Sequence, residues 1–348
     1  MFKFIQRLHA MCNTTPGTIY PGLNAAKGIL VILVILTHAL PNSMLLYFFY
    51  IFHMPLFLSV SGYLLKRSVF NNGFRNLLKR SSQRSLIPWA IASLVYLPFS
   101  LQGRSITQLT IMNLLYPFYH LWYVPAYFIG VMLCYAVAQL RIPVKLVLLI
   151  TASFTVIWYI FFRDSHLPVT EQPLYWLGEK RFYAYLFFFF LGFALRNEYI
   201  RIFPNPFFLL SAIAIVFVTI VVFVFNHLPD FAIAILYLLF NAGCVLFVLL
   251  YVGPQQWLQH KFILFINKQS LGIYLYHPLI LFTIYHLIGD PEKQHISNLE
   301  GFGVGVVTVI ITALLVYLVK EWRFANRYFF GILKDEKDLV VKGVLVAA

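Results

Sequence analysis

The chain has 348 residues, of which 61% are hydrophobic and only 11% charged, and its formal net charge is +14. A water-soluble fold of this length does not need so much apolar surface, so the composition excludes a soluble globular enzyme and predicts an integral membrane protein. The basic residues stand in short connections between apolar runs, which argues against a nucleic-acid-binding face. Three widely spaced cysteines predict neither a disulfide framework nor a metal site.

Ten apolar segments follow one another along the chain. A helix that crosses the hydrocarbon layer needs roughly 20 apolar residues. The pattern therefore predicts an all-α integral membrane fold, a bundle of about ten transmembrane helices. The predicted spans are residues 23–40, 44–65, 86–101, 119–140, 144–162, 182–195, 206–225, 231–252, 271–288 and 302–319. The third and sixth spans are short, which indicates a kink or shielding by neighbouring helices.

Lysine and arginine fall mainly on one side of this arrangement. With both termini in the cytoplasm, 20 of the 26 Lys and Arg residues are cytoplasmic, five are external, and Lys27 lies within the first span. This bias predicts a multi-pass protein of the plasma membrane with both its N and its C terminus in the cytoplasm. We divide the chain into a cytoplasmic segment 1–22, a transmembrane domain 23–320 and a cytoplasmic tail 321–348. The start lacks a signal-peptide cleavage pattern.

The first predicted span carries two ionisable residues on one face. Lys27 and His38 are eleven positions apart, which is three helical turns plus roughly 20°, and about 16 Å along the axis. Burying a cation in hydrocarbon costs on the order of 2.5 kcal/mol or more, so we expect both to line one polar passage. The alternatives are a lysine that snorkels to the membrane surface and a histidine of the packed core.

The second predicted span carries His53, Pro55, Ser61 and Gly62. A short hairpin joins it to the first span, so His53 is predicted to lie at nearly the depth of His38 and to share its pocket. Ser61 and Gly62 permit close approach of a ligand, or of a neighbouring helix, since helix packing alone also explains the pattern.

A basic loop follows, in which Arg80 and Arg84 gather at the predicted cytoplasmic surface. Guanidinium groups bind phosphates bidentately, so these residues could hold a nucleotide-bearing donor. The positive-inside rule is the alternative explanation.

Further candidates lie later in the chain. His120 and Trp122 open the fourth span at its predicted outer edge, where they could contact an external acceptor or belong to an interfacial aromatic belt. His277, followed by a proline, is another histidine inside a span. Residues 179–181 (Glu-Lys-Arg) could form mutual ion pairs or contact an acceptor.

These residues occur in the order of motifs found in the acyltransferase-3 family of bacterial membrane acyltransferases, which the chain resembles over roughly residues 20–320. The matching elements are a basic residue and a histidine with ten residues between them (Lys27, His38), the segment from His53 to Tyr63, the Arg80, Arg84 and Pro88 pattern, the His-Leu-Trp sequence at 120–122, and the segment from Ser270 to His277. Two departures are Asn24, where relatives commonly carry an acidic residue, and Lys27, where arginine is frequent.

The resemblance implies a standalone membrane-embedded O-acyltransferase that moves an acetyl or similar short acyl group from cytoplasmic acyl-CoA to a hydroxyl of an envelope glycan or exopolysaccharide. It implies that the chain resides in the bacterial cytoplasmic membrane and that polysaccharide synthesis or export proteins are its partners. No metal is expected.

The resemblance also assigns roles to the candidate residues. His38 would be the general base or a transient acyl carrier, with His53 or Ser61 in support. Lys27, Arg80, Arg84 and Ser61 would bind the donor. The remaining candidates, His120, Trp122 and His277, would contact the acceptor.

Two other function classes fit a bundle with buried ionisable groups. A transporter or flippase of polysaccharide or lipid-linked sugar would also place histidine and lysine inside the membrane. Such carriers often contain inverted repeats and paired broken helices, and neither is evident in the sequence. A structural subunit of a polysaccharide synthase is a third possibility, which the buried ionisable stripe disfavours.

Overall fold

The computed structural model describes residues 21–100, 114–161, 177–225, 229–255, 258, 260–319 and 322–332. Within these ranges every regular element is a helix, which confirms the predicted all-α class. Residues 1–20 of the predicted N-terminal segment and most of the predicted C-terminal tail lie outside the described residues.

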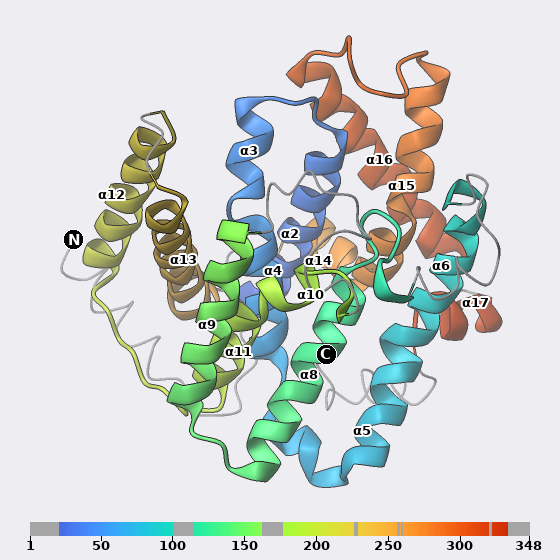
Figure 1. Ribbon diagram of the computed structural model, residues 1–348. Helices are drawn as coiled ribbons and strands as arrows, with labels where there is room; N and C mark the ends of the chain where they lie inside the picture. Colours follow the sequence, from blue (N-terminus) through green and yellow to red (C-terminus); the bar gives the residue numbers. More distant parts are fainter. Residues whose placement is uncertain are drawn as a thin grey trace.

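Helices occupy all ten predicted positions, and shorter helices lie between them (Figure 1). The main helices are α2 (Pro21–Ala39), α3 (Met44–Tyr50), α4 (His53–Leu64), α5 (Phe74–Ser81), α6 (Ile87–Ser100), α8 (Tyr123–Leu140), α9 (Val144–Phe161), α10 (Arg181–Ala184), α11 (Leu186–Arg196), α12 (Pro206–Phe225), α13 (Asp230–Phe247), α14 (Lys261–Lys268), α15 (Ser270–Leu287), α16 (Asn298–Val319) and α17 (Arg323–Tyr328). Two π-helical turns, η2 (Ser82–Leu86) and η5 (Val248–Val252), and the 3₁₀ helix η1 (Arg67–Asn72) complete the described set.

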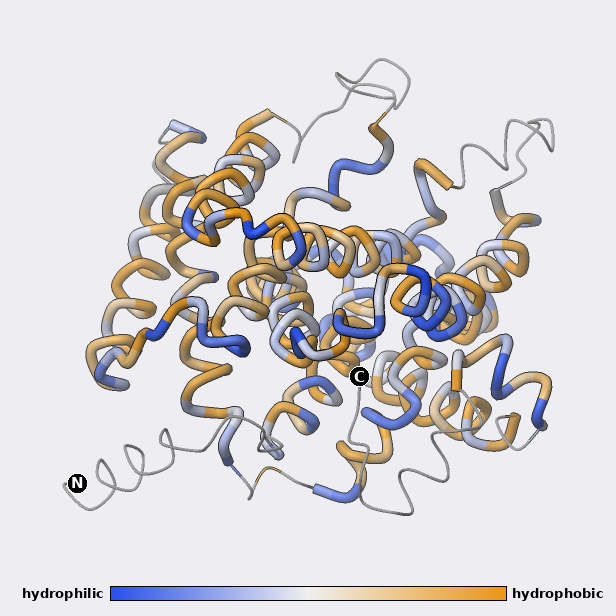
Figure 2. Tube along the Cα trace, turned by 90° about the horizontal axis from the view of Figure 1, so that it is seen from below, coloured by the Kyte–Doolittle hydropathy of each residue, from blue (hydrophilic) through white to orange (hydrophobic). Residues whose placement is uncertain are grey.

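Six candidate spans are long and apolar enough to cross a membrane by length and composition. They are α2, α3 with α4, α8, α9, α13 with η5, and α16. Viewed from the α5 end, the helices are apolar along most of their length, and hydrophilic segments occur mainly at their ends (Figure 2). Large side chains such as Phe208 and Leu318 are exposed on the outside, as expected where lipid covers them. The protein is therefore a multi-pass membrane protein. The count of ten spans stays a prediction.

Helix α2 is the centre of the bundle, in contact with α4, α14, α15 and α16. Small residues make this possible, because a Cβ at Gly28 would lie 2.6 Å from the carbonyl oxygen of Ile263 in α14. On the α16 side, a Cβ at Gly305 would lie 2.7 Å from the side chain of Leu36. Close approach on several sides holds α2, and with it Lys27 and His38, in one orientation.

Helices α4 and α11 form the tightest pair. A Cβ at Gly62 would lie 2.0 Å from the carbonyl oxygen of Phe189, and one at Gly192 would lie 2.1 Å from the carbonyl oxygen of Ser59. The two glycines therefore let the backbones touch in both directions. This contact fixes the face of α4 that carries Ser61.

Helices α5, η2 and α6 form one continuous helical segment from Phe74 to Ser100, widened by a π turn at Ser82–Leu86. Arg84 lies in that turn. The segment after α17 packs on it, since a Cβ at Gly331 would lie 2.0 Å from the carbonyl oxygen of Arg84. π turns inside α-helices frequently mark functional sites, and this one carries a candidate donor-binding arginine.

Candidate active site

A cavity of about 160 Å³ lies among α2, α4, α5, η2, α8 and α15. Lys27, Ser61, Arg80 and Arg84 all line it, so the structure brings together the four side chains that the sequence proposes for donor binding. Its described lining includes no acidic residue. We call it the basic cavity.

The inner wall of the basic cavity is aromatic and contains one polar pair. The Ser61 hydroxyl donates to the carbonyl of Phe57 at 2.9 Å, and its oxygen lies 2.8 Å from the hydroxyl of Tyr123. A serine has one hydroxyl proton, so Tyr123 is the donor in the second bond. The Phe57 ring stacks on Tyr123 with centres 4.7 Å apart, and Tyr274 lies 5.2 Å from Tyr123.

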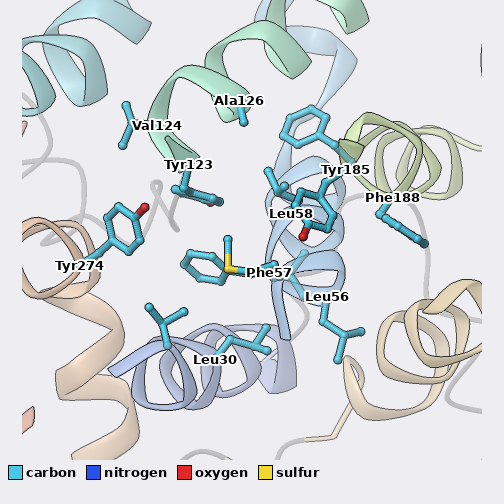
Figure 3. Close-up of a cluster of buried hydrophobic side chains, with 14 of the residues drawn as sticks. Leu30, Leu56, Phe57, Leu58, Tyr123, Val124, Ala126, Tyr185, Phe188 and Tyr274 are labelled. Atoms are coloured by element: carbon cyan, nitrogen blue, oxygen red, sulfur yellow. The ribbon is translucent and has the colours of Figure 1, made fainter. Parts of the chain in front are cut away.

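A packed layer separates Lys27 from His38 on the same helix. Leu30, one turn beyond Lys27, packs in the buried cluster with Phe57, Tyr123 and Tyr274 (Figure 3). His38 is not among the described residues that line the basic cavity. The expected continuous polar passage is therefore wrong for this conformation. The physical reason is that aromatic side chains from α4, α8 and α15 fill the space beside the aliphatic residues of α2.

Three histidines meet beyond this layer. The ring centres of His38 and His277 are 5.3 Å apart, those of His120 and His277 are 5.1 Å apart, and those of His38 and His120 are 6.4 Å apart. We call these three residues the histidine cluster. His120 and His277 are buried, with 2% and 0% exposure. Both were predicted to contact the acceptor, His120 at the outer edge and His277 from within a span. The structure places both in the interior beside His38.

Backbone carbonyls determine which nitrogen carries the proton in two of these rings. His120 Nε2 lies 3.2 Å from the carbonyl of Leu275, and His277 Nδ1 lies 2.8 Å from that of Tyr274. A carbonyl only accepts, so these nitrogens are protonated in the neutral rings. His120 Nδ1 and His277 Nε2 then carry lone pairs, and both are buried without a hydrogen-bond partner among the described residues.

His38 differs from the other two because its Nδ1 bonds to a side chain. The hydroxyl oxygen of Tyr119 lies 2.8 Å from His38 Nδ1. Tyr119 has a φ of 44°, which is rare for a bulky residue. This contact could not be predicted, because no local pattern indicates a left-handed tyrosine that pairs with a residue 81 positions away.

His53, which was predicted to share the pocket of His38, lies outside the histidine cluster, although it is near enough to His38 for an electrostatic interaction. It is 2% exposed, and its Nδ1 lies 2.8 Å from the carbonyl of Phe49. That bond places the proton on Nδ1 in the neutral ring and leaves Nε2 as the basic nitrogen.

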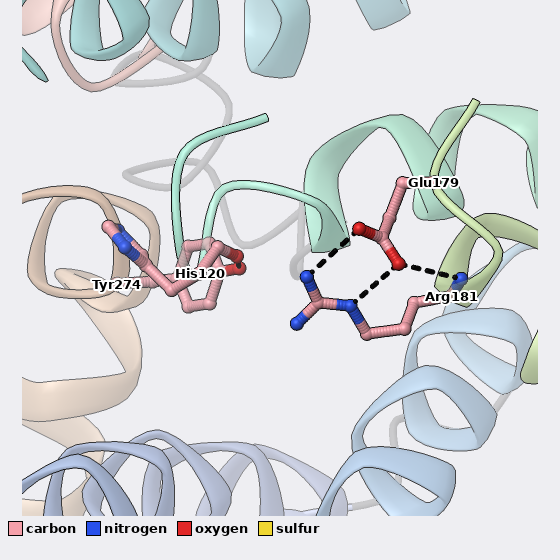
Figure 4. Close-up of polar contacts among 4 residues, drawn as sticks. All are labelled: His120, Glu179, Arg181 and Tyr274. Atoms are coloured by element: carbon pink, nitrogen blue, oxygen red, sulfur yellow. Dashed lines mark hydrogen bonds and ion pairs between the residues drawn. The ribbon is translucent and has the colours of Figure 1, made fainter. Parts of the chain in front are cut away.

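An ion pair lies on the α10 side of the cluster. Arg181 Nε and Nη2 bind the Glu179 carboxylate at 3.0 and 3.1 Å, and the guanidinium lies 5.1 Å from the ring centre of Trp122. Burial acts to raise the pKa of Glu179, but the hydrogen bonds and charge of Arg181 outweigh it, so the pKa lies below its ordinary value. Figure 4 shows the guanidinium on the side facing His120 and Tyr274.

Two roles were considered for residues 179–181, a mutual ion pair and a contact with the acceptor. The ion pair expected there is confirmed for Glu179 and Arg181. Trp122, predicted at an open edge, is 6% exposed and holds the guanidinium instead. The sequence did not predict that Arg181 lies beside the histidine cluster. An arginine two residues after a glutamate carries no information about which helix its side chain faces.

Comparison with known proteins bears on this arrangement. The sequence model of the family described as an acyltransferase domain (acyltransferase-3) matches residues 20–318. Neither the curated proteins nor the solved structures include a match to the chain. The matched range includes the basic cavity and the histidine cluster completely. The chain therefore belongs to the acyltransferase-3 family.

Proposed function

We propose that the protein is an O-acyltransferase that carries an acetyl or similar short acyl group from cytoplasmic acyl-CoA to a hydroxyl of an envelope glycan or exopolysaccharide. The observation that carries the proposal is the arrangement on α2, where Lys27 lines the basic cavity and His38 joins the histidine cluster further along the same helix. One rigid helix, α2, therefore carries a cation for the donor site and the imidazole that would take the proton of the acceptor hydroxyl.

The basic cavity suits the phosphates of acyl-CoA. Lys27, Arg80 and Arg84 supply cationic side chains from α2, α5 and η2, and no carboxylate in the described lining competes with an anionic ligand. Arginine binds phosphate through paired N–H groups, and lysine acts as a point charge. Ser61 and Tyr123 stand on the inner wall, where the thioester end of the donor would lie.

His38 would act as the general base. It takes the proton of the acceptor hydroxyl as the hydroxyl oxygen attacks the thioester carbonyl. The C–S bond then breaks, and the CoA thiolate leaves and receives the proton. An acyl group carried briefly on His38 is the variant of this route that the imidazole also permits. We assign His53 and Ser61 a supporting role beside the reacting groups and no part in making or breaking the bonds.

The packed layer must open for this transfer. Phe57 and Tyr274 both line the basic cavity and belong to the buried cluster in front of the histidines. Rotation of these rings would join the donor site to His38, and binding of the donor would supply the free energy for it. A layer that stays closed until the donor binds also keeps water out of the reaction site.

The proposed topology follows from the charge bias. Ten spans with both termini in the cytoplasm place the basic cavity on the cytoplasmic side, where acyl-CoA is made, and the far end of α2 toward the outside. We place the protein in the bacterial cytoplasmic membrane. Polysaccharide synthesis and export proteins would be its partners.

Reconstitution tests the proposal. The protein in lipid vesicles is supplied with acetyl-CoA labelled in the acetyl group and with glycan from cells that lack the protein. Label in the glycan that mild base releases supports an O-acyltransferase. Passage of unmodified glycan across the vesicle without label would instead support a flippase. Mass spectrometry of the surface glycan from cells with and without the protein identifies the acyl group and its acceptor.

A further inference from the structure

A second cavity lies at the end of the bundle opposite the basic cavity. It has a volume of about 800 Å³ and lies between the turn that joins α2 to α3 and the loop that joins α15 to α16. In Figure 1 these two connections lie together at the top, away from α5. We call it the loop cavity. Its size is in the range of sites for small molecules.

The α15–α16 loop that forms one wall is held in place. The Asp290 carboxylate accepts hydrogen bonds from the backbone N–H groups of Gln294 and His295, both at 2.9 Å. The following helix starts with a capping box, in which Ser297 and Glu300 bond reciprocally. The wall is therefore built by specific contacts and is not a loose connection.

Lys293 ties this loop to the reacting helix. Its ammonium donates a hydrogen bond to the backbone carbonyl of His38 and lies 5.4 Å from the ring centre of Tyr285. Lys293 also lines the loop cavity. The cavity is thus attached directly to the residue proposed as the base.

The lining of the loop cavity indicates a neutral, hydroxyl-rich ligand. Its polar side chains are mainly amides and hydroxyls, and its described charged residues are one acid, Glu292, and one base, Lys293. Amides and hydroxyls both donate and accept, as a sugar hydroxyl requires. A phosphate or carboxylate would favour an excess of cations, which the basic cavity has and this one lacks. The rings of Tyr50 and Tyr119 add flat surfaces for a sugar ring.

Tyr119 connects this cavity to the histidine cluster. It lines the loop cavity, and its hydroxyl oxygen lies 2.8 Å from His38 Nδ1. The φ of 44° shows that the surrounding structure holds this tyrosine in a disfavoured backbone conformation. A hydroxyl group therefore already occupies the place from which a ligand in the loop cavity would reach Nδ1 of His38.

We propose that the loop cavity binds the acceptor as a neutral sugar unit, and that its reacting hydroxyl replaces the Tyr119 hydroxyl at Nδ1 of His38. This inference rests on the proposed acyl transfer. The acceptor O–H proton passes to Nδ1, the oxygen forms the new ester bond, and the thiolate released from CoA receives the proton. His120 and Trp122 then lie behind the reacting groups and do not meet the incoming glycan.

A blocking variant tests the site. Asn42 lines the loop cavity from the exposed α2–α3 turn, so Asn42→Trp should fill the cavity without disturbing the bundle. The matched control is His286→Trp, an exposed position in the last turn of α15 that does not line the cavity. Both variants are reconstituted with labelled acetyl-CoA and with glycan from cells that lack the protein, and the Kd for acetyl-CoA is measured separately.

We expect Asn42→Trp to reduce glycan labelling at least tenfold, with the Kd for acetyl-CoA within twofold of the wild-type value, and His286→Trp to change neither quantity. Equal labelling by the two variants would overturn the inference, and so would an equal loss of labelling and of acetyl-CoA affinity in Asn42→Trp. Absence of both acetyl-CoA binding and labelling in the wild-type protein would refute the proposed function itself.

A second variant tests the placement of the hydroxyl. Tyr119→Phe removes the hydroxyl group that occupies Nδ1 of His38. A neutral hydrogen bond of about 0.5–1.5 kcal/mol holds this hydroxyl in place. We therefore expect the glycan concentration at half-maximal rate to fall about two- to tenfold. A tenfold loss of the maximal rate would show that the Tyr119 hydroxyl takes part in the reaction, which contradicts the replacement.

Discussion

The imidazole of His38 stacks on that of His277, with ring centres 5.3 Å apart and planes inclined by 24°. His277 is fully buried, and its Nδ1 is bound to backbone carbonyls of its own helix, so it forms a fixed wall for the reacting ring. His38 has a side-chain partner instead, which a ligand can displace. We therefore propose that His38, and not the fixed His277, exchanges a proton with an incoming hydroxyl.

His38→Gln is therefore expected to abolish most of the acyl transfer. A positioned general base contributes about 10²- to 10⁴-fold to a rate, so the maximal rate of glycan labelling should fall at least 10²-fold. The Kd for acetyl-CoA should stay near the wild-type value, because His38 is not among the described lining of the basic cavity. His286→Gln, on the exposed surface of α15, is the control. A His38→Gln protein that labels glycan at the wild-type rate would exclude the mechanism.

Donor binding should depend on the two arginines of the α5–η2 segment. A hydrogen bond to a charged group is worth about 1.5–3 kcal/mol, so Arg80→Gln or Arg84→Gln should weaken acetyl-CoA binding about tenfold or more. The effect should be smaller at high salt, because ions screen the remaining attraction. Arg75→Gln is the matched control, since Arg75 is exposed on α5 and does not line the basic cavity. Equal Kd values for all three variants would remove the phosphate site from this cavity.

Part of this site follows from the sequence. The resemblance to the acyltransferase-3 family implies a donor site that contains Lys27, Ser61 and Arg84, and all three line the basic cavity. The spacing of Lys27 and His38 places them on one face of a single helix. Helical periodicity is a local property, so such inferences need no tertiary information.

The remainder depends on contacts between distant segments. Phe57 and Tyr274, which close the passage, come from helices that are far apart in the chain. The sequence of a span does not distinguish an aromatic side chain that packs inside the bundle from one that faces lipid. The bond from Tyr119 to His38 and the link from Lys293 to the His38 carbonyl arise from loop conformations that no periodic pattern encodes.

The glycines between α4 and α11 should be essential for stability. Gly62→Ala or Gly192→Ala would place a methyl group about 2 Å from a backbone carbonyl, so the helices would have to separate. Overpacking of this kind typically costs about 1–3 kcal/mol or more. We expect a clear loss of thermal stability in detergent, or no folded protein at all.

Gly303 in α16 provides the control for this comparison, because a Cβ there would meet nothing within 4 Å. Gly303→Ala should leave stability unchanged or raise it by up to about 1 kcal/mol, since alanine is the better helix former. Equal melting temperatures for Gly62→Ala and Gly303→Ala would show that the α4–α11 contact is not as close as described.

The ion pair of Glu179 and Arg181 should make stability depend on pH in acid. The pKa of Glu179 is lower in the folded protein than in the unfolded chain, so its contribution is fully present above the ordinary glutamate pKa and is lost as the pH falls through the lower folded value. The Arg181 side chain is 35% exposed, and solvent screening limits the contribution at neutral pH to about 1 kcal/mol or less. Glu179→Gln should therefore lower the melting temperature slightly at pH 7, and its difference from the wild-type protein should vanish in acid.

Thermal unfolding in detergent at a series of pH values measures this difference directly. Glu198→Gln is the comparison, because the Glu198–Arg201 pair is exposed, with 43% and 70% of the side chains accessible, and such pairs contribute little. The two variants should separate at neutral pH and converge as the pH falls. A difference between Glu179→Gln and wild type that grows in acid would reverse the sign of the linkage. It would mean that burial, and not the Arg181 guanidinium, sets the protonation of Glu179 beside the histidine cluster.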